Sequence, residues 1–360
     1  MTAWDDAIVS PRRTVASRVD VVTVDGTTLG SIPCDAVSVD FNGEQAEQWR
    51  ASFRFSDPTV VPLSTSSVLD GRSGLLLRPF WRMQLPDGGG WYEVPCGTYV
   101  VEDPAFTDSG ALSGTVPGLD VLALARRGGY GASVIPVGGL TVDAALRRLF
   151  GVLVPQFPVS IEPSTVTLPP AMELWDRDPA EDWTEIAAMA GLVVRTNRLG
   201  VITARRPPSP TSVRADWQEG ASCPVTELSV ETKTSTIPRR VVVVSNNPDV
   251  VPPVVGEWVN PDADSQMIVT EQRIESSTVT TVEAANNLAR MSGERWSRPQ
   301  VNVDVMVPAR PDLDYRDPIA LSRHQVNLSG VYQVSGWSFE LRGPDDPPGL
   351  MKVSLMTKGE

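Results

Sequence analysis

Alternating apolar and polar residues dominate the first third of the chain. Residues 49–55 read WRASFRF, in which every second residue is apolar and the residues between them are arginine or serine. Strict alternation is typical of a β-strand with one buried face and one wet face. Residues 18–30 also favour a strand, and they contain Asp25-Gly26, a dipeptide that favours a tight hairpin turn. A second hairpin is predicted around residues 86–90, and no helix is predicted before residue 117.

The pattern changes between residues 118 and 206, where apolar residues recur at helical spacing. Residues 119–127, LDVLALARR, predict a short helix. Residues 141–150 predict another helix, for which Thr141 is the N-cap and Gly151 is the stop. This middle part of the chain is therefore expected to mix helices with strands.

The third predicted helix has the clearest start signal. Asp178 can cap it, Pro179 suits the first helical position, and Glu181 follows the cap by three residues, as in a capping box. Gly191 is expected to end the helix, and two strands joined by residues 197–200 follow. One apolar stripe runs along the helix and consists of Trp183, Ile186, Ala187 and Ala190.

Strand patterns return after a proline-rich stretch, RRPPSPTS, at residues 205–212. Prolines cannot join a central strand, so this stretch predicts a stiff linker. One helix interrupts the later strands, with Thr280 as its cap and Glu283 as the capping-box partner. The four valines at 241–244 predict a buried strand. Residues 247–264 are proline-rich and predict a long loop that contacts another protein.

The fold class predicted from these patterns is mainly β with an α+β insert. Two related β-barrel-like modules would flank a small helix-plus-hairpin domain. The predicted parts are an N-terminal arm at 1–14, a first β-barrel module at 15–117, an α+β middle domain at 118–206, a proline-rich linker at 207–212, and a second β-barrel module at 213–360 with one helix at 280–296.

A short repeat supports the idea of two related modules. Residues 97–110 read GTYVVEDPAFTDSG, and residues 330–343 read GVYQVSGWSFELRG. Aligned without a gap, the two segments share five residues and each closes a β-rich region. We predict that they superpose as the closing strand pairs of the two modules. The shared residues are Gly97 and Gly330, Tyr99 and Tyr332, Val101 and Val334, Phe106 and Phe339, and Gly110 and Gly343.

Composition narrows the possible functions. The chain has 360 residues, a hydrophobic fraction of 41% and a formal net charge of −13. An acidic chain is poorly suited to holding nucleic acid, because phosphate contacts need lysine and arginine. The amino terminus carries Asp5 and Asp6 and lacks the apolar core of a signal peptide, so we expect folding in a cytoplasm. No apolar run has the length of a transmembrane helix.

The residue types needed for most catalytic centres are scarce. The three cysteines, Cys34, Cys96 and Cys223, lack metal-ligand spacing, and the single histidine, His324, lies in a polar turn-like stretch. The glycine-rich residues 127–131 match neither phosphate-binding pattern. We predict no catalytic residue, no cofactor site and no metal site, and the sequence leaves the interface residues unknown.

The order of these pieces resembles the tail hub or baseplate hub family of phages, which includes siphophage minor tail proteins at the tail tip. The resemblance rests on residues 113–127, 141–150, 182–207 and 282–321 and covers most of residues 15–345. Asn197 occupies a turn position that is usually acidic in that family. The individual motifs are degenerate, so their order carries the resemblance.

The resemblance implies a structural virion protein rather than an enzyme. In that family three chains close into a ring with pseudo-six-fold symmetry, which joins the tail tube to the three-fold tip. The implied partners are two further copies of the chain, a distal tail or tail tube protein, a tape measure protein, tail-tip or receptor-binding proteins, and DNA as passing cargo. The implied location is the virion tail tip, after assembly in the host cytoplasm. No cofactor is implied.

Two other functions remain open at this stage. The first is a hub with cell-wall-degrading activity, because acidic residues cluster near the third helix and paired carboxylates serve glycosidases and metal sites. The same acids are also expected at a helix N-terminus, where the helix dipole favours them. The cluster consists of Asp176, Asp178, Glu181, Asp182 and Glu185.

The second is a carbohydrate- or receptor-binding tail-tip protein, because the chain has ten tryptophans and exposed tryptophans can stack on sugars. The patterns place some tryptophans in the core and leave others in or beside hairpins. The latter could be exposed, but burial in the core or in a subunit interface is favoured, because buried aromatic residues dominate interfaces. The predicted core tryptophans are Trp49, Trp183 and Trp296, and the candidates for exposure are Trp81, Trp91 and Trp337.

Overall fold

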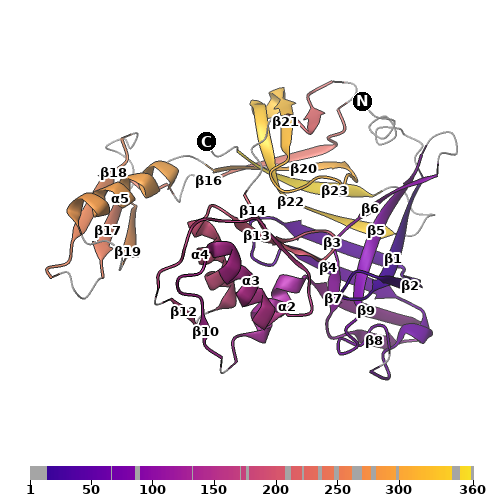
Figure 1. Ribbon diagram of the computed structural model, residues 1–360. Helices are drawn as coiled ribbons and strands as arrows, with labels where there is room; N and C mark the ends of the chain where they lie inside the picture. Colours follow the sequence, from indigo (N-terminus) through magenta and orange to yellow (C-terminus); the bar gives the residue numbers. More distant parts are fainter. Residues whose placement is uncertain are drawn as a thin grey trace. The chain divides into compact units, whose positions relative to one another are not determined.

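The structure is a computed structural model (Figure 1). It describes residues 14–65, 67–85, 90–131, 133–170, 172–175, 178–206, 212–220, 223–233, 237–246, 251–261, 270–276, 281–296, 300–342 and 349–357. The predicted N-terminal arm, apart from Thr14, and the predicted linker, apart from Ser212, lie outside these residues, as do Asp176, Thr280 and most of the turn at 86–90.

The chain divides into two compact units. The first consists of Met1–Leu228 and Asp304–Lys358, and the second of Ser229–Val303 with Gly359–Glu360. The chain runs from the first unit into the second within strand β16 (Glu227–Lys233) and returns within strand β20 (Gln300–Pro308).

The first β region forms the strands that its alternation predicts. In β4 (Trp49–Phe55) every second residue is buried. Gly26 adopts a φ of 90° in the turn between β1 (Val15–Val22) and β2 (Thr28–Ile32), which explains the glycine there. The other strands of this region are β3 (Ala36–Asn42), β5 (Leu76–Gln84), β6 (Trp91–Pro95), β7 (Tyr99–Val101), β8 (Ala105–Asp108) and β9 (Leu112–Leu119), and a 3-10 turn, η1, spans Pro58–Val60.

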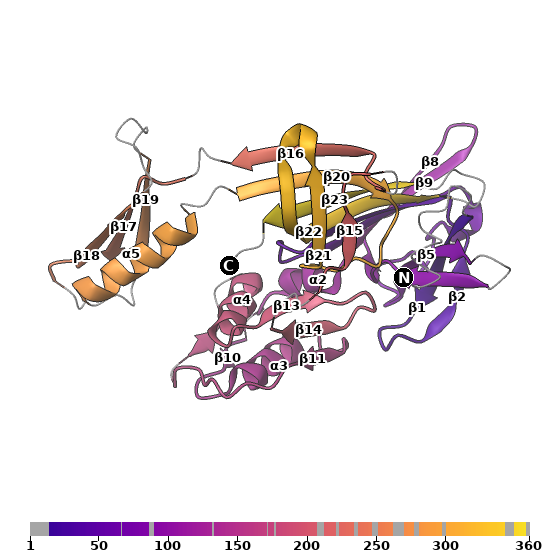
Figure 2. The ribbon, with the colours of Figure 1, turned by 90° about the horizontal axis from the view of Figure 1, so that it is seen from above.

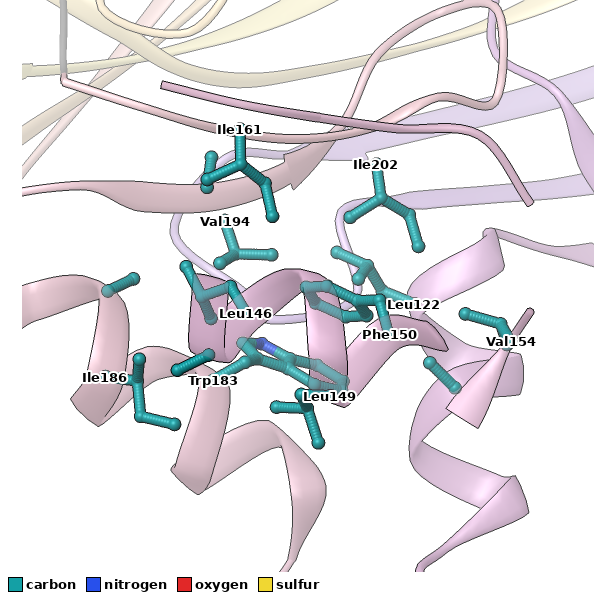
Figure 3. Close-up of a cluster of buried hydrophobic side chains, with 14 of the residues drawn as sticks. Leu122, Leu146, Leu149, Phe150, Val154, Ile161, Trp183, Ile186, Val194 and Ile202 are labelled. Atoms are coloured by element: carbon teal, nitrogen blue, oxygen red, sulfur yellow. The ribbon is translucent and has the colours of Figure 1, made fainter. Parts of the chain in front are cut away.

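The middle region contains the three predicted helices, packed beside short strands. The helices are α2 (Val121–Gly128), α3 (Val142–Leu153) and α4 (Pro179–Met189). The strands are β10 (Ile135–Pro136), β11 (Val159–Ile161), β12 (Glu173–Leu174), β13 (Val193–Thr196) and β14 (Ile202–Arg205). Figure 3 shows side chains of the helices meeting those of the strands in one apolar cluster, with Leu146, Phe150 and Trp183 fully or almost fully buried.

The helix boundaries agree with the sequence at α4 and differ at α3. Asp178 caps α4 by accepting a hydrogen bond from Ala180 N–H, and Gly191 follows the helix with a φ of 69°. Gly151 was expected to stop α3, but it lies inside that helix, which ends at Leu153. A glycine is tolerated there because packing outweighs its weak helix propensity. Thr141 precedes α3, but its hydroxyl donates to Asp143 and does not cap the helix.

The C-terminal β region adds β15 (Ala215–Trp217), β21 (Pro318–Arg323), β22 (Leu328–Arg342) and β23 (Leu350–Thr357) to β16 and β20, with a 3-10 turn, η3, at His324–Val326. All these strands and those of the first β region belong to one sheet, which Figure 2 shows from above. Its order is β16-β20-β23-β22-β3-β4-β9-β7-β5-β1-β2, while β15, β21, β6 and β8 pair beside this path.

The mainly β fold class with a small helical part is confirmed, but no closed barrel forms among the described strands. β3 of the first β region pairs antiparallel with β22 of the C-terminal one, from Gly336↔Asn42 to Arg342↔Ala36. Alternation identifies strands but not their partners, so it could not predict this pairing.

The two repeat segments differ in their strands. Residues 97–110 contain two separate strands, β7 and β8, whereas residues 330–342 lie in the single long strand β22, whose register shifts between Val334 and Gly336. The Gly-x-Tyr start has a local cause in the first segment, where a Cβ on Gly97 would lie 2.5 Å from Tyr99 Oη. At Gly330 the nearest atom, Tyr332 Cε2, would be 3.7 Å away. Superposition of the segments stays a prediction.

The second unit is a three-stranded sheet with one helix on it. The sheet order is β18 (Val255–Val259), β17 (Arg240–Ser245), β19 (Glu271–Ser276), and the helix is α5 (Val282–Trp296). Its core consists of Val241, Val243, Ala285 and Ala289. The prediction of an irregular loop at 247–264 is wrong for β18, since Gly256 and Trp258 pack on α5 and provide a packing reason for a strand.

Candidate functional site

One face of the central sheet is polar along strands from both β regions. On β4 the outward residues are Arg50, Ser52 and Arg54, and the register places Ser38 and Asp40 of β3 beside them. Ser338 and Glu340 of β22 continue the row, and Lys352 and Ser354 of β23 follow. Asp304 of β20 contacts both of the last two. We call these ten residues the polar face.

The charges of the polar face balance and are mostly paired. Its three cations, Arg50, Arg54 and Lys352, face three carboxylates. Arg54 lies 3.5 Å from Glu340, and Lys352 lies 2.8 Å from Asp304. Ser354 Oγ donates to Asp304 at 2.6 Å. The polar face is therefore neutral, although the chain as a whole has a net charge of −13. The remaining residues of the face are serines, whose side chains are short.

Burial raises the pKa of Asp40 above its usual value, while the nearby Arg50 and Lys352 act in the opposite direction. The pKa of Asp304 is lowered, because hydrogen bonds from Lys352 and Ser354 outweigh partial burial. These shifts arise from contacts within the face itself. They give no sign of an acid–base pair prepared for catalysis.

The opposite face of the same strands carries a buried aromatic row. Cross-strand pairing places Phe41 between Trp49 and Trp337. The Phe41 ring centroid lies 4.4 Å from that of Trp49 and 5.5 Å from that of Trp337. The two tryptophans are at most 3% exposed. This row joins β4 of the first region to β22 of the C-terminal region through apolar contact.

The β13–β14 hairpin of the middle region inserts beside the aromatic row. Trp49 Nε1–H donates to the carbonyl of Thr196 at 3.0 Å, and Trp337 Nε1–H donates to the carbonyl of Leu313 at 2.9 Å. Asn197 Oδ1 shapes the hairpin tip, residues 197–200, because it accepts hydrogen bonds from Leu199 N–H and Val201 N–H.

Arg198 in this tip connects the middle region to both the first and the C-terminal β region. Its guanidinium donates to the carbonyl of Pro95 at 3.3 Å, to that of Leu313 at 2.8 Å, and to that of Pro311. It also pairs with Asp314 at 2.8 Å. The guanidinium carbon lies 5.8 Å and 5.9 Å from the ring centroids of Trp49 and Trp337. Only 15% of the Arg198 side chain is exposed.

Two further contacts hold the same hairpin. Arg78 Nη2–H donates to the carbonyl of Leu199 at 3.1 Å, and burial lowers the pKa of this arginine. On the other side, the Arg195 guanidinium lies 3.6 Å from the ring centroid of Tyr315, whose hydroxyl bonds to Glu44. The hairpin is therefore the structural link between the middle region and the sheet that carries the polar face.

Asp120 makes the second such link. It caps α2 by accepting from Ala123 N–H at 3.0 Å, and it also accepts from Gln48 N–H and Trp49 N–H at 2.9 and 3.3 Å. Burial raises the pKa of Asp120 to about 6, although these hydrogen bonds oppose the rise. The carboxyl ties the start of β4 to the first helix of the middle region.

We expect Asp120 to make stability depend on pH. Its pKa is about 6 in the folded chain and about 3.9 in an unfolded one. Protonation therefore stabilises the fold fully below about pH 4, and this contribution is lost as the pH rises through 6. Between pH 7 and pH 4.5, urea unfolding should show the wild type gaining up to about 2 kcal/mol relative to Asp120→Asn. Parallel stability profiles for the wild type and Asp120→Asn would contradict the prediction.

A groove of about 340 Å³ lies where four central strands end. Its charged and polar groups already have partners, since Arg54 pairs with Glu340 and Ser56 Oγ donates to Asp35 at 3.0 Å. The lining residues are Asp35, Ala36, Arg54, Phe55, Ser56, Leu112, Ser113 and Glu340.

Two residues of the acidic cluster, Asp178 and Asp182, have structural partners. Asp178 caps α4 and pairs with Arg126 at 2.6 Å, and the buried Asp182 accepts a hydrogen bond from Tyr130 at 2.5 Å. Within the described residues, no group of three or more histidine, cysteine or acidic side chains could hold a metal ion. Tyr130 lies in the glycine-rich residues 127–131, whose structural role the sequence pattern did not show.

The remaining candidate residues are also accounted for. His324 is exposed, as predicted. Burial raises the pKa of the Cys34 and Cys96 thiols to about 12, so neither is a thiolate nucleophile at neutral pH. In the described part of the chain, no helix is long and apolar enough to cross a membrane.

The tryptophans considered for sugar stacking are mostly buried. Trp81 and Trp337 are 1% and 2% exposed, so neither ring is available to stack on a sugar, and burial, the favoured alternative for both, holds. Both have apolar neighbours on the inner face of strands, which a hairpin position alone does not reveal. Trp91 is exposed, and Arg82 stacks on it at 4.7 Å. Trp49 and Trp183 are buried as predicted, and Trp296 is partly buried.

Solved structures share this fold along almost the whole chain. A tail protein from Neisseria meningitidis MC58 matches with a TM-score of 0.67 and 14% identity, over 96% of this chain and 97% of that one. The 43 kDa tail protein of prophage MuSo2 from Shewanella oneidensis matches with a TM-score of 0.64 and 12% identity, over 95% and 98% of the two chains.

A third match is the prophage tail protein gp18 from Listeria monocytogenes EGD-e, with a TM-score of 0.53 and 11% identity, over 95% of this chain and 94% of that one. No family model matches the sequence, and no curated protein does. The likeness lies in the fold, and it confirms the fold to which the order of sequence motifs pointed.

Proposed function

We propose that this chain is a structural protein of a phage tail and forms the hub at its distal end. Three copies would close into a ring with pseudo-six-fold symmetry that joins the tail tube to the tip. The observation that supports this most is the shared fold with tail proteins, which covers at least 95% of this chain in the two matches with the highest TM-scores.

The partners in this proposal follow from the position of a hub. They are a distal tail or tail tube protein on one side, tail-tip or receptor-binding proteins on the other, and a tape measure protein within. The chain would assemble in the host cytoplasm and act in the virion without enzymatic activity. The paired charges of the acidic cluster and of the groove favour a structural role over a catalytic one.

The polar face suits the lumen of such a ring. DNA that passes through a tail must not bind its wall, and a surface binds DNA chiefly through unpaired lysine and arginine. In the polar face every cation has a carboxylate nearby, as with Arg54 and Glu340. The serines Ser38, Ser52 and Ser338 add only short side chains between the charged ones.

Adding positive charge to this face should slow DNA passage. The variant Ser38→Lys/Ser52→Lys/Ser338→Lys adds three cations, and we expect the rate of DNA ejection from assembled particles to fall about tenfold or more. The matched control places three lysines at Thr28, Thr165 and Gln325, which are exposed away from the polar face. Normal ejection from tails that contain the polar-face variant would contradict the lumen assignment.

The ring itself is tested by mass measurement and imaging. Light scattering of the purified chain should detect a trimer, and images of assembled tails should place three copies around the axis at the distal end. A chain that has no three-fold place in a tail would overturn the proposed function.

A further inference from the structure

The central sheet has an edge strand at each end of the polar face, and neither of these two strands is covered by a packed core. β16 is the outermost strand next to β20, and β8 is the outer strand of the β8–β9 hairpin. Among the described strands, each pairs on one side only. Figure 2 shows the β8–β9 hairpin extending from the sheet.

Both strands are exposed on both faces, which is unusual for strands of a sheet that packs against a core. In β8, residues Ala105, Thr107 and Asp108 are exposed, and only Phe106 is partly covered, where its ring packs over Gly114. In β16, Leu228 is partly covered, whereas the other residues from Glu227 to Thr232 are exposed, Val230 by 36%. A two-stranded ribbon gains little stability in water without a packed face or a further strand.

We propose that β8 of one copy pairs edge to edge with β16 of the next copy. This inference rests on the proposed trimeric ring and names the surfaces that close it. An unpaired edge presents a row of N–H and C=O groups that another strand can satisfy. The two edges differ from each other, so their contact is head to tail, and such contacts close into rings when the rotation per copy allows it.

The position of the two strands is what selects a second copy as the partner. The polar face runs from β20 through β23, β22, β3 and β4, and it lies between the two free edges. Joining β8 to β16 of another copy therefore continues the same polar surface from chain to chain. Pairing at β2, the free edge at the far end of the strand order, would not extend this surface in the same way.

Neither strand has a charged residue or a proline at its centre, where lysine and proline commonly guard an edge. β8 contains one charged residue, Asp108, at its end, and no proline. β16 reads ELSVETK and lacks proline; its charged residues are Glu227, Glu231 and Lys233, and its central residue, Val230, is apolar. A lysine at the centre of either strand is therefore the smallest change that should block the contact.

Light scattering over a range of concentrations tests the pairing in the full chain. Thr107→Lys and Val230→Lys should each weaken trimer formation about tenfold or more, because each places an unpaired charge between two strands. The control Thr28→Lys, on the free edge of β2, should leave the trimer unchanged. The double variant Thr107→Lys/Val230→Glu should restore association, since the two side chains attract across the boundary between copies.

The outcomes separate this pairing from the proposed function. A trimer that tolerates Thr107→Lys and Val230→Lys, or one that Thr28→Lys disrupts, overturns the β8–β16 contact and leaves the ring in place. A wild type that stays monomeric at every concentration also overturns the contact, because two free edges would associate when concentrated. The ring is then judged separately, by the three-fold position of the chain in tail images.

Discussion

Replacing Arg198 by alanine is expected to lower the free energy of unfolding by about 3 kcal/mol. The guanidinium bonds to carbonyls of Pro95, Pro311 and Leu313, and both Pro311 and Leu313 are buried. Without the arginine those carbonyls would lose their charged donor in a site that water reaches poorly. Urea unfolding followed by tryptophan fluorescence measures the change, because Trp49 and Trp337 lie beside the guanidinium.

Arg205→Ala is the matched control for this prediction. Arg205 lies on the same hairpin, in β14, but it is exposed and makes one long hydrogen bond to Ser160 Oγ, at 3.4 Å. Its loss should cost less than about 0.5 kcal/mol. Arg198→Lys keeps the charge but lacks the planar fork that serves several acceptors at once, so it should be only partly stabilising. Equal losses for Arg198→Ala and Arg205→Ala would show that the contacts of Arg198 are not significant.

The role of Arg198 bears on how the polar face is held. The carbonyls that it binds come from the end of β6 and from the loop after β20, while the arginine itself belongs to the middle region. One side chain thus fixes three stretches of sequence behind the strands that carry the polar face. A ring that must keep a constant bore would need such a rigid backing.

The local structure of this chain was readable from its sequence. Alternation in residues 49–55, the turn at Asp25-Gly26 and the cap at Asp178 each concern residues close together in the chain. Their physical causes are backbone geometry and short-range hydrogen bonds. The hairpin at 197–200 was predicted for the same reason, and the structure adds how Asn197 holds it.

Errors arose where distant residues decide the structure. Gly151 stays in α3 because the helix continues to pack, and residues 255–259 form β18 because Gly256 and Trp258 fit against α5. The pairing of β3 with β22 is of the same kind, since it joins residues almost 300 positions apart. Propensity is a weak guide at such places because tertiary packing overrides it.

The candidate site was the least predictable part. In the sequence, each residue of the polar face is an ordinary outward-facing residue of a separate strand. Only the strand register brings Arg54 beside Glu340. The importance of Arg198 was also hidden, because an arginine in a hairpin tip is expected to be solvated. One signal was present in the sequence. Two tryptophans, at 49 and 337, each lie in an alternating strand of a different β region.

Replacing Trp337 by alanine is expected to have the largest effect of any single change considered, about 4 kcal/mol of unfolding free energy. The side chain is almost fully buried and touches Phe41, Trp49 and Phe339. Its Nε1–H also satisfies the buried carbonyl of Leu313 at 2.9 Å. Alanine would therefore leave a cavity, and the carbonyl of Leu313 would keep only its hydrogen bond from Arg198. Urea unfolding by circular dichroism measures the loss.

Two further variants separate these causes. Trp337→Phe keeps most of the ring volume and loses the hydrogen bond, so it should cost about 1–2 kcal/mol. Trp91→Ala removes an exposed tryptophan and should cost less than about 1 kcal/mol.

Because Phe41 of β3 and Trp337 of β22 are cross-strand neighbours, Trp337→Ala should weaken both β regions in one transition. If unfolding instead separated into two steps, with residues 15–117 unaffected by the substitution, the two β regions would be independent folding units. The shared sheet would then be a contact between them and not a common core.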